Sequence, residues 1–240
     1  MKKHLIILVV FFCFFSVVIS IEAKDMNNNL LDNYNELELK YYNNELKLEV
    51  LIEKLINLDR KLKDNKNNFE KNFSQAKIYF LLGEIKKIEE NEEKAIKYYE
   101  KSQKFAEKAL ERRENSDIYN MLGDSYIRLL TRKGAFYAVR NGQKTFDFIN
   151  KAIELDENNY SAYNSLGIIY FEAPKIGGGD INKSIENFKK ALESDDKIEN
   201  FISYYHLAEA YKKIDKNDMA EKYFQKAKNI FPENYYIKNY

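Results

Sequence analysis

The stretch Tyr204 to Tyr211 (YYHLAEAY) decides the fold, because it places Tyr204, Leu207 and Tyr211 at helical spacing around the small Ala208. Steps of three and four residues bring these side chains onto one face of an α-helix. A small residue within that face lets a second helix approach closely. The stretch that follows supplies the second helix, with Ala220, Phe224 and Ala227 at positions i, i+4 and i+7. We therefore predict a helical hairpin.

The same pattern recurs three times upstream. The copies are Tyr79, Leu82 and Gly83 with Ala95, Tyr99 and Ser102; Tyr119, Leu122, Gly123 and Tyr126 with Thr145, Ile149 and Ala152; and Tyr163, Leu166, Gly167 and Tyr170 with Ser184, Phe188 and Ala191. In the earliest copy Lys86 occupies the place of the second aromatic residue. Each hairpin leaves an apolar face that only the next hairpin covers, so the hairpins are expected to stack. These patterned residues are interpreted as core, not as ligand contacts.

The repeated pattern resembles the tetratricopeptide repeat (TPR) family, with an aromatic residue in place of its tryptophan and Pro232 at its end. The resemblance implies an all-α fold: a TPR-like right-handed solenoid of stacked antiparallel helix pairs. Four recognisable repeats occupy residues 69–232. It also implies a protein-protein interaction scaffold. The composition agrees with helices, since 240 residues include only 8 Gly and 2 Pro but 19 Tyr and 16 Phe.

Residues 24–68 precede the repeats and form a separate helical segment. Apolar residues follow alternating three- and four-residue steps from Tyr34 to Leu62, interrupted at Asn44. This spacing fits one long heptad helix that pairs with another chain in a homo-oligomer. It also fits a break at Asn43-Asn44, which gives a degenerate N-terminal helical hairpin that covers the first repeat; we favour the hairpin. Residues 64–68 are then a linker, and the tail 233–240 either folds back onto the last helix or stays mobile.

Residues 1–23 have the pattern of an export signal. A short basic start precedes an apolar run from Leu5 to Ile21, and an Asn-rich chain follows. We expect cleavage after Ser20 or Ala23, which would place the protein in a bacterial periplasm or cell envelope. The alternatives are an uncleaved membrane anchor over residues 5–21 and lipidation at Cys13.

The charge and cysteine content exclude several classes of function. A net charge of +1 gives no overall field that would attract nucleic acid or an anionic membrane. Beyond Cys13 the chain has no cysteine, and its only histidine there is His206, so we expect no cofactor, no metal site and no enzyme. The acidic pairs Glu89-Glu90 and Asp195-Asp196 are interpreted as solvated.

The two middle repeats are longer than the others. The small residues of the two helices are 12 positions apart in the regular repeats, but 22 apart from Gly123 to Thr145 and 17 apart from Gly167 to Ser184. Insertions at 132–142 and 172–180 therefore lie at the turn between the helices, and both should emerge on one edge of the stack. The first is expected to prolong the first helix of its pair. The second should break at Pro174 and restart a helix with Asp180 as its N-cap.

Two kinds of candidate site follow. Helical phase places a mixed set of side chains on the concave face, with Asn120 and Asn164 as the preferred peptide-binding pair. The full concave set is Asn120, Asp124, Ile127, Asn164, Ile168, Phe171, Tyr205, Glu209 and Lys212. The insertions offer anion or ligand contacts, namely Arg128, Arg132, Lys133, Arg140, Gly178 and Gly179. The alternatives for these are a charged face paired with neighbouring acids and a plain capped turn.

The leading hypothesis is an exported, non-enzymatic scaffold that binds a peptide or protein partner on its concave face. The alternative is a solute-binding or transporter-associated component with a pocket walled by the two insertions. That alternative rests on the general layout and on the Pro/Gly-Gly-Asp loop, which are similar to TPR proteins that accompany periplasmic TRAP-type transporters.

Overall fold

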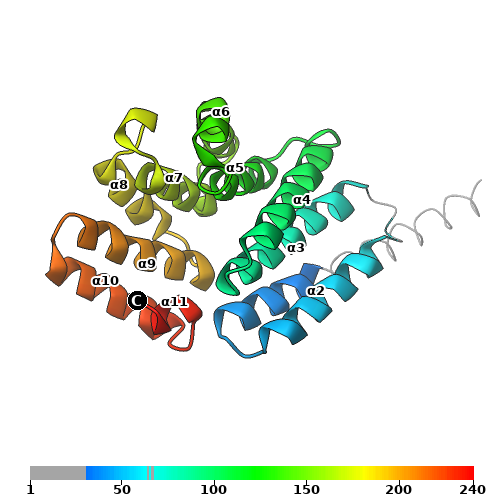
Figure 1. The fold of residues 1–240 in the computed structure, drawn as a ribbon, viewed down its shortest axis with the longest axis horizontal. Coiled ribbons are helices and arrows are strands. Elements are labelled where there is room, and N and C mark those ends of the chain that lie inside the picture. The colour runs from blue at the N-terminus through cyan, green and yellow to red at the C-terminus, as the bar shows by residue number, and fades with distance from the viewer. Residues whose placement is uncertain (1–30, 64, 66–67) are drawn as a thin grey trace, which may run out of the picture.

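The computed structural model describes residues 31–63, 65 and 68–240, and their regular elements are helices that pack in chain order (Figure 1). A helix over residues 31–42 comes first. The elements that follow are α2 (Leu48–Leu62), α3 (Asn68–Ile88), α4 (Glu92–Leu110), α5 (Ser116–Leu130), α6 (Gly134–Leu155), α7 (Tyr160–Glu172), the 3-10 turn η1 (Lys175–Gly177), α8 (Ile181–Ala191), α9 (Lys197–Lys213), α10 (Asn217–Ile230) and α11 (Tyr235–Lys238).

The four predicted hairpins are present as α3–α4, α5–α6, α7–α8 and α9–α10, and the second helix of each pair packs on the first helix of the next. Within the first three pairs the predicted glycine is the contact point. A Cβ atom on Gly83 would lie 2.5 Å from Tyr99, and one on Gly167 would lie 2.6 Å from Phe188. Both aromatic rings are fully buried. The repeated pattern therefore describes core packing, as predicted.

The segment before the repeats is a broken hairpin in its described part, as we favoured. The helix over 31–42 ends in a turn, and α2 begins at Leu48. Asn44 has a φ of 54°, a left-handed conformation that asparagine tolerates better than most residues. The side chains of both helices form one apolar cluster with α3, which covers the first repeat. Of the predicted linker, Asp64, Lys66 and Asn67 lie outside the described residues, and Asn68 begins α3.

Side chains of Asn and Asp start most of the repeat helices. Asn91, Asn115 and Asn159 each accept a hydrogen bond from the backbone N–H three residues later. Asp180 and Asp196 do the same for α8 and α9. An N-cap acceptor satisfies a backbone donor that the helix itself leaves free. These asparagine and aspartate side chains thus fix where five of the repeat helices begin.

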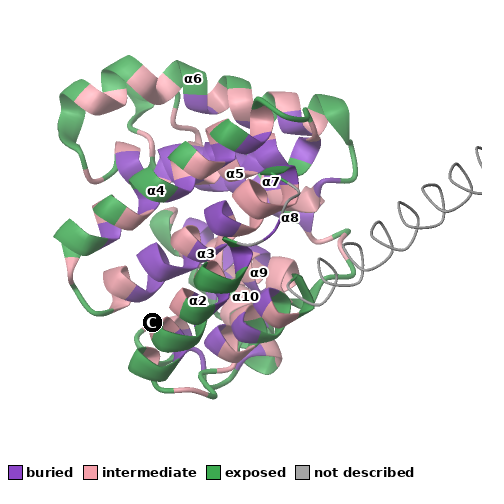
Figure 2. Cartoon of the chain, turned by 90° about the vertical axis from the view of Figure 1, so that its right-hand side faces the viewer, coloured by how far each residue is buried: buried purple, intermediate pink, exposed green. Residues whose placement is uncertain are grey.

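The first insertion lengthens the second helix of its pair, so our prediction that it prolongs the first helix is wrong. Helix α5 ends at Leu130, and α6 begins at Gly134 and runs for 22 residues. Gly134 has a φ of 80°, a conformation that favours glycine. The chain therefore turns between α5 and α6 at the start of the insertion, and the other inserted residues join α6. Figure 2 shows α6 along an edge of the molecule, with much of its surface exposed. The second insertion is as predicted: Pro174 precedes η1, and Asp180 caps α8.

The two ends of the described chain meet. Figure 1 shows the helix pairs on an arc that brings α11 next to the N-terminal hairpin. The ring of Tyr42 packs on Phe201 and Phe231, with 5.7 Å between ring centroids in each case. Asn234 Nδ2 donates a 2.9 Å hydrogen bond to the carbonyl oxygen of Tyr42. The tail therefore folds back, and Tyr240 stacks on Phe224 at 4.1 Å.

The expected export signal at residues 1–23 lies outside the described residues. Within residues 31–63, 65 and 68–240, no helix has the length and apolar character needed to span a membrane.

Candidate functional site

The concave face holds two adjoining cavities, which together form the concave site. The acidic cleft, of about 640 Å³, lies between the helix over 31–42, α3, α5 and the start of α9. The inner cavity, of about 250 Å³, lies between α3, α5, α7, α9 and α11. The cavities share six lining residues, namely Tyr42, Phe80, Asp124, Ser161, Glu199 and Ile202. The concave site is therefore continuous and draws on the first helix of every repeat.

The inner cavity contains a buried ion pair. Arg128 Nε donates to Glu84 Oε1 at 2.6 Å, and Tyr99 donates to the same oxygen at 2.8 Å. Burial opposes ionisation of Glu84, but Arg128 and Lys87 outweigh it and hold the pKa of its carboxyl well below the ordinary value. Tyr236 donates to Glu84 Oε2 at 3.3 Å. This network joins α3, α4, α5 and α11 across the centre of the molecule.

His206 also lines the inner cavity, and its surroundings keep it neutral. Burial, with the nearby charges of Arg128 and Lys87, lowers the pKa of His206 to about 3. Its ring stacks on Phe188 at 5.3 Å. The imidazole is therefore neutral and packed against an aromatic ring.

The two asparagines that we preferred for peptide binding are buried, with exposed fractions of 5% for Asn120 and 2% for Asn164. Asn164 Nδ2 donates to Glu199 Oε2 at 2.7 Å and to the Glu199 carbonyl at 3.1 Å, and its Oδ1 accepts from Ser203 at 2.7 Å. Asn164 thus connects α7 to α9, and both N–H groups of its side chain are already used in this contact. Asn120 Nδ2 donates to Ser161 at 2.9 Å, but Asn120 Oδ1 has no hydrogen-bond partner.

The other predicted concave residues divide into two groups. Asp124, Ile168, Phe171, Tyr205 and Glu209 line the inner cavity, as expected from helical phase. Ile127 and Lys212 do not line the concave site, which corrects their assignment. Ile127 precedes Arg128, and one residue turns an α-helix by about 100°. Its side chain therefore leaves α5 in a different direction and lines the groove between the insertions. Lys212 is exposed, with its Nζ 4.2 Å from the ring centroid of Tyr240.

Carboxyl groups from different elements gather at the acidic cleft. Burial raises the pKa of Asp124 to about 6, against the opposing effects of Ser165 and Arg128. Burial also raises the pKa of Glu199 to about 7, and the charges of Asp124 and Asp196 raise it further. Sequence analysis missed Glu199, because a glutamate in the first turn of a helix also suits the helix dipole. Asp195 and Asp196 line the same cleft, and both are exposed, which agrees with our interpretation of them as solvated.

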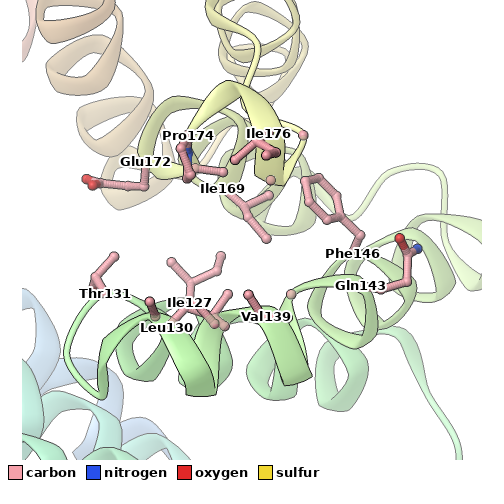
Figure 3. A pocket seen from close by; sticks show the side chains of 16 residues that line it. Ile127, Leu130, Thr131, Val139, Gln143, Phe146, Ile169, Glu172, Pro174 and Ile176 are labelled. Atoms are coloured by element: carbon pink, nitrogen blue, oxygen red, sulfur yellow. The ribbon is translucent and has the colours of Figure 1, made fainter.

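The two insertions face each other across a third cavity of about 770 Å³, the insertion groove (Figure 3). Ile169, Pro174 and Ile176 lie on one side, and Ile127, Leu130 and Val139 lie on the other. Phe136, Val139 and Ile176 are 86%, 87% and 99% exposed. Glu172 is the charged residue of the lining. The predicted emergence of both insertions on one edge is therefore seen, and the groove between them is apolar.

Arg132 and Lys133 of the first insertion pair with acids, which was one of our two alternatives for these basic residues. Arg132 Nε lies 3.1 Å from Glu92, and Lys133 Nζ lies 2.6 Å from Glu100. Arg128 belongs to the inner cavity, and Arg140 is exposed on α6. None of these four residues lines the insertion groove.

The glycines of the second insertion do not offer an anion cradle. The backbone N–H groups of Gly177, Gly178, Gly179 and Asp180 all donate to carbonyl oxygens of residues 170–175. Gly178 has a φ of 92°, and a Cβ atom on Gly179 would lie 1.9 Å from the Ala173 carbonyl oxygen. Both glycines are thus explained by backbone geometry, which is the plain capped turn among our alternatives. Gly178 lines the insertion groove and Gly179 does not.

Within the part of the chain that the structure describes, no group of His, Cys, Asp and Glu is arranged to hold a metal ion.

Comparison with known proteins agrees with the helix-pair architecture. The pattern of the tetratricopeptide repeat matches residues 76–109 and 202–234, which lie in α3–α4 and in α9–α10 with the turn that follows. These two segments are tetratricopeptide repeats, and the chain has the fold of a TPR-like helical solenoid. Such repeats form protein-protein interaction scaffolds that bind protein or peptide partners and are generally non-enzymatic.

Solved structures with a similar fold include the Cut9–Hcn1 hetero-tetramer of the APC/C. The TM-score is 0.50 at 15% sequence identity, over 87% of this chain and 38% of that chain. The chain is also similar to YrrB, a TPR protein with an unusual peptide-binding site (TM-score 0.41, 19% identity, 86% and 89% covered), and to MamA (TM-score 0.39, 20% identity, 76% and 88% covered). No curated protein matches the chain significantly.

Proposed function

We propose that the protein is an exported, non-enzymatic TPR scaffold of the cell envelope that binds a protein or peptide partner in its concave site. The observation that carries this proposal is the continuity of the acidic cleft and the inner cavity along the first helices of all four repeats. A site that every repeat helps to build suits an extended segment that contacts several helices in turn. The aromatic residues Tyr42, Phe80 and Tyr205 supply the apolar contacts.

A peptide-library selection with two tryptophan variants tests where the partner binds. Ile202 lines both cavities, so Ile202→Trp should fill the concave site. Lys97 is exposed on α4, away from either cavity, and Lys97→Trp is the matched control. Peptides selected by the wild type should lose at least tenfold in affinity for Ile202→Trp and keep their affinity for Lys97→Trp. Equal binding to both variants, with unchanged circular dichroism spectra, would show that the partner does not bind in the concave site.

Export is the second part of the proposal and rests on the apolar run from Leu5 to Ile21. Mass spectrometry of the protein from its native cells tests it directly. A mature chain that begins after Ser20 or Ala23 supports a cleaved signal, whereas a retained Met1 supports the membrane anchor. Recovery of the full-length chain in the cytosolic fraction would exclude export.

A solute-binding or transporter-associated role is the second candidate function, and the insertion groove favours it. A volume of about 770 Å³ is within the usual range for small-molecule sites. The lining is apolar, and Glu172 gives it a negative charge, so the suited solute is apolar and not an organic anion. A thermal-shift screen of medium-chain alcohols and ketones tests this role, because a ligand at 100 times its dissociation constant adds about 2.7 kcal/mol. Stabilisation that Val139→Ala abolishes would support it, and no stabilising compound would count against it.

A further inference from the structure

The acidic cleft has an excess of negative charge. Its lining includes the carboxylates Glu38, Asp117, Asp124, Asp195, Asp196 and Glu199, and the lysines Lys77 and Lys197. The acids come from the helix over 31–42, from α5 and from the start of α9, so residues far apart in the chain converge on one space. Lys77 Nζ lies between aromatic rings, 5.3 Å from the centroid of Tyr34 and 5.5 Å from that of Phe73.

The hydrogen bonds to the innermost carboxylates come from neutral donors. Asp124 accepts from Ser165 and from Asn120, and Glu199 accepts from Asn164. Glu38 accepts a 2.9 Å hydrogen bond from Tyr34, and burial raises the pKa of its carboxyl even though Lys77 opposes the shift. The inner cavity differs, because Glu84 there has Arg128 at 2.6 Å. A buried carboxylate is costly unless a cation neutralises it.

Asn120 gives an independent sign of a missing partner in the same cleft. Asn120 lines the cleft and has an exposed fraction of only 5%. Its Oδ1 has no hydrogen-bond partner. Its Nδ2 is already used by Ser161 and Asp124. An acceptor left in this way is satisfied by a donor from outside the chain, either a water molecule or a side chain that enters the cleft.

The walls of the cleft suit the aliphatic part of a long cationic side chain. Aromatic and aliphatic residues line it beside the acids, among them Phe73, Phe80, Met121, Ile198 and Ile202. Lysine and arginine pack their methylene groups on apolar surface and present the charge beyond it. An aromatic ring next to a carboxylate attracts the same cation.

We propose that the acidic cleft binds a lysine or arginine side chain of the partner protein or peptide, between Asp124, Glu199 and Glu38, with Asn120 Oδ1 as a further acceptor. This inference rests on the proposed function, since it names the chemistry of the segment that enters the concave site. Guanidinium groups donate several hydrogen bonds to carboxylates at once, so arginine is the better probe.

The test compares the peptide Gly-Arg-Phe-Arg-Gly-amide, labelled with fluorescein at its N-terminus, with its citrulline counterpart, which has the same shape without charge. Fluorescence anisotropy should show at least tenfold tighter binding of the arginine peptide, with affinity that falls as salt rises. The double variant Asp124→Asn/Glu199→Gln should weaken its binding at least fivefold. The control Glu53→Gln/Glu186→Gln removes two exposed acids outside the cleft and should leave binding unchanged.

Stability separates a binding role from a structural one. Because neutral amides replace two carboxylates whose charged forms burial disfavours, the cleft variant should melt at a higher temperature at pH 8 than the wild type while it binds the peptide less well. A variant that loses both stability and binding would show that these acids hold the fold, and would overturn the proposal.

Other outcomes are equally decisive. Equal affinity for the arginine and citrulline peptides overturns the cationic site but leaves the proposed function standing if the library peptides still depend on Ile202. Tighter binding of free spermidine than of the arginine peptide, lost in the cleft variant, would show a site for small polyamines instead. Failure of every peptide, charged or neutral, defeats the proposed function itself.

Discussion

Gly123 shows how a single residue sets the distance between two helices. A Cβ atom there would lie 2.5 Å from Ile149 Cγ1, in a place where both residues are buried. We expect Gly123→Ala to lower the free energy of unfolding by about 1–3 kcal/mol, because overpacking a tight core displaces its neighbours. Urea denaturation followed by circular dichroism measures this change.

Gly142 provides the control for that substitution. It lies within α6, and a Cβ atom there would meet nothing within 4 Å. Gly142→Ala should leave stability unchanged or raise it by up to about 1 kcal/mol, since alanine favours a helix over glycine. Similar losses in both variants would mean that close approach at Gly123 is not the cause.

Two acidic residues of the concave site should respond to pH in opposite directions. Glu84 has a lowered pKa in the folded protein, so its stabilising effect is present above the unfolded pKa and is lost as the pH falls. Glu84→Gln leaves Arg128 unpaired and should cost about 3 kcal/mol at pH 7, with a smaller difference at pH 3. Denaturation curves at the two pH values measure the change.

Asp124 is the opposite case, because its pKa is raised to about 6. A raised acid pKa means that the folded protein holds the proton more tightly, so stability falls as the pH rises from about 4 to about 6. Asp124→Asn removes the disfavoured charge and should gain about 1–2 kcal/mol at pH 8, with little gain at pH 4. A loss of stability at pH 8 would contradict the raised pKa.

At the scale of the element, N-caps decide where helices begin. Asp180 Oδ1 accepts from Asn182 N at 2.9 Å and from Lys183 N at 3.2 Å, directly after the glycine loop. Asp180→Ala should cost about 1 kcal/mol, whereas Asp180→Asn keeps an acceptor and should cost much less. Thermal melts of the two variants, followed by circular dichroism, compare them. Equal losses would show that the charge and not the acceptor matters.

Local patterns in the sequence predicted the elements better than their ends. The glycine positions predicted the helix pairs, and Pro174 with Asp180 predicted the second insertion, because each depends on neighbouring residues alone. The first insertion was assigned to the wrong helix of its pair, since a run such as residues 134–142 extends either helix equally well by propensity. Position along a repeat also could not show that Asn164 would meet Glu199 of the next repeat, because that contact depends on how the repeats stack.

At the scale of the whole molecule, the sequence pattern could not predict that the two ends of the solenoid meet. The contacts between Asn234 and Tyr42, 192 positions apart, and between Tyr236 and Glu84 depend on the accumulated rotation of every repeat. The sequence offered only tyrosines in the tail, with two alternatives for their place. The contact between the two ends also helps to build the concave site, because Tyr42 and Tyr236 both line the inner cavity.

The tail therefore connects the last repeat to the N-terminal hairpin. Removing the tail tests whether this contact stabilises the hairpin. A chain that ends at Pro232 loses Asn234, Tyr236 and the buried Ile237. We expect hydrogen exchange at residues 31–62 to become faster, while the central helices α5 to α8 keep their protection, because solenoid repeats depend mainly on their immediate neighbours. Asn239→Ala, which alters an exposed residue of the same tail, is the control. Unchanged exchange at residues 31–62 would mean that packing on α3 alone holds the hairpin, and that the ends of the solenoid meet without stabilising each other.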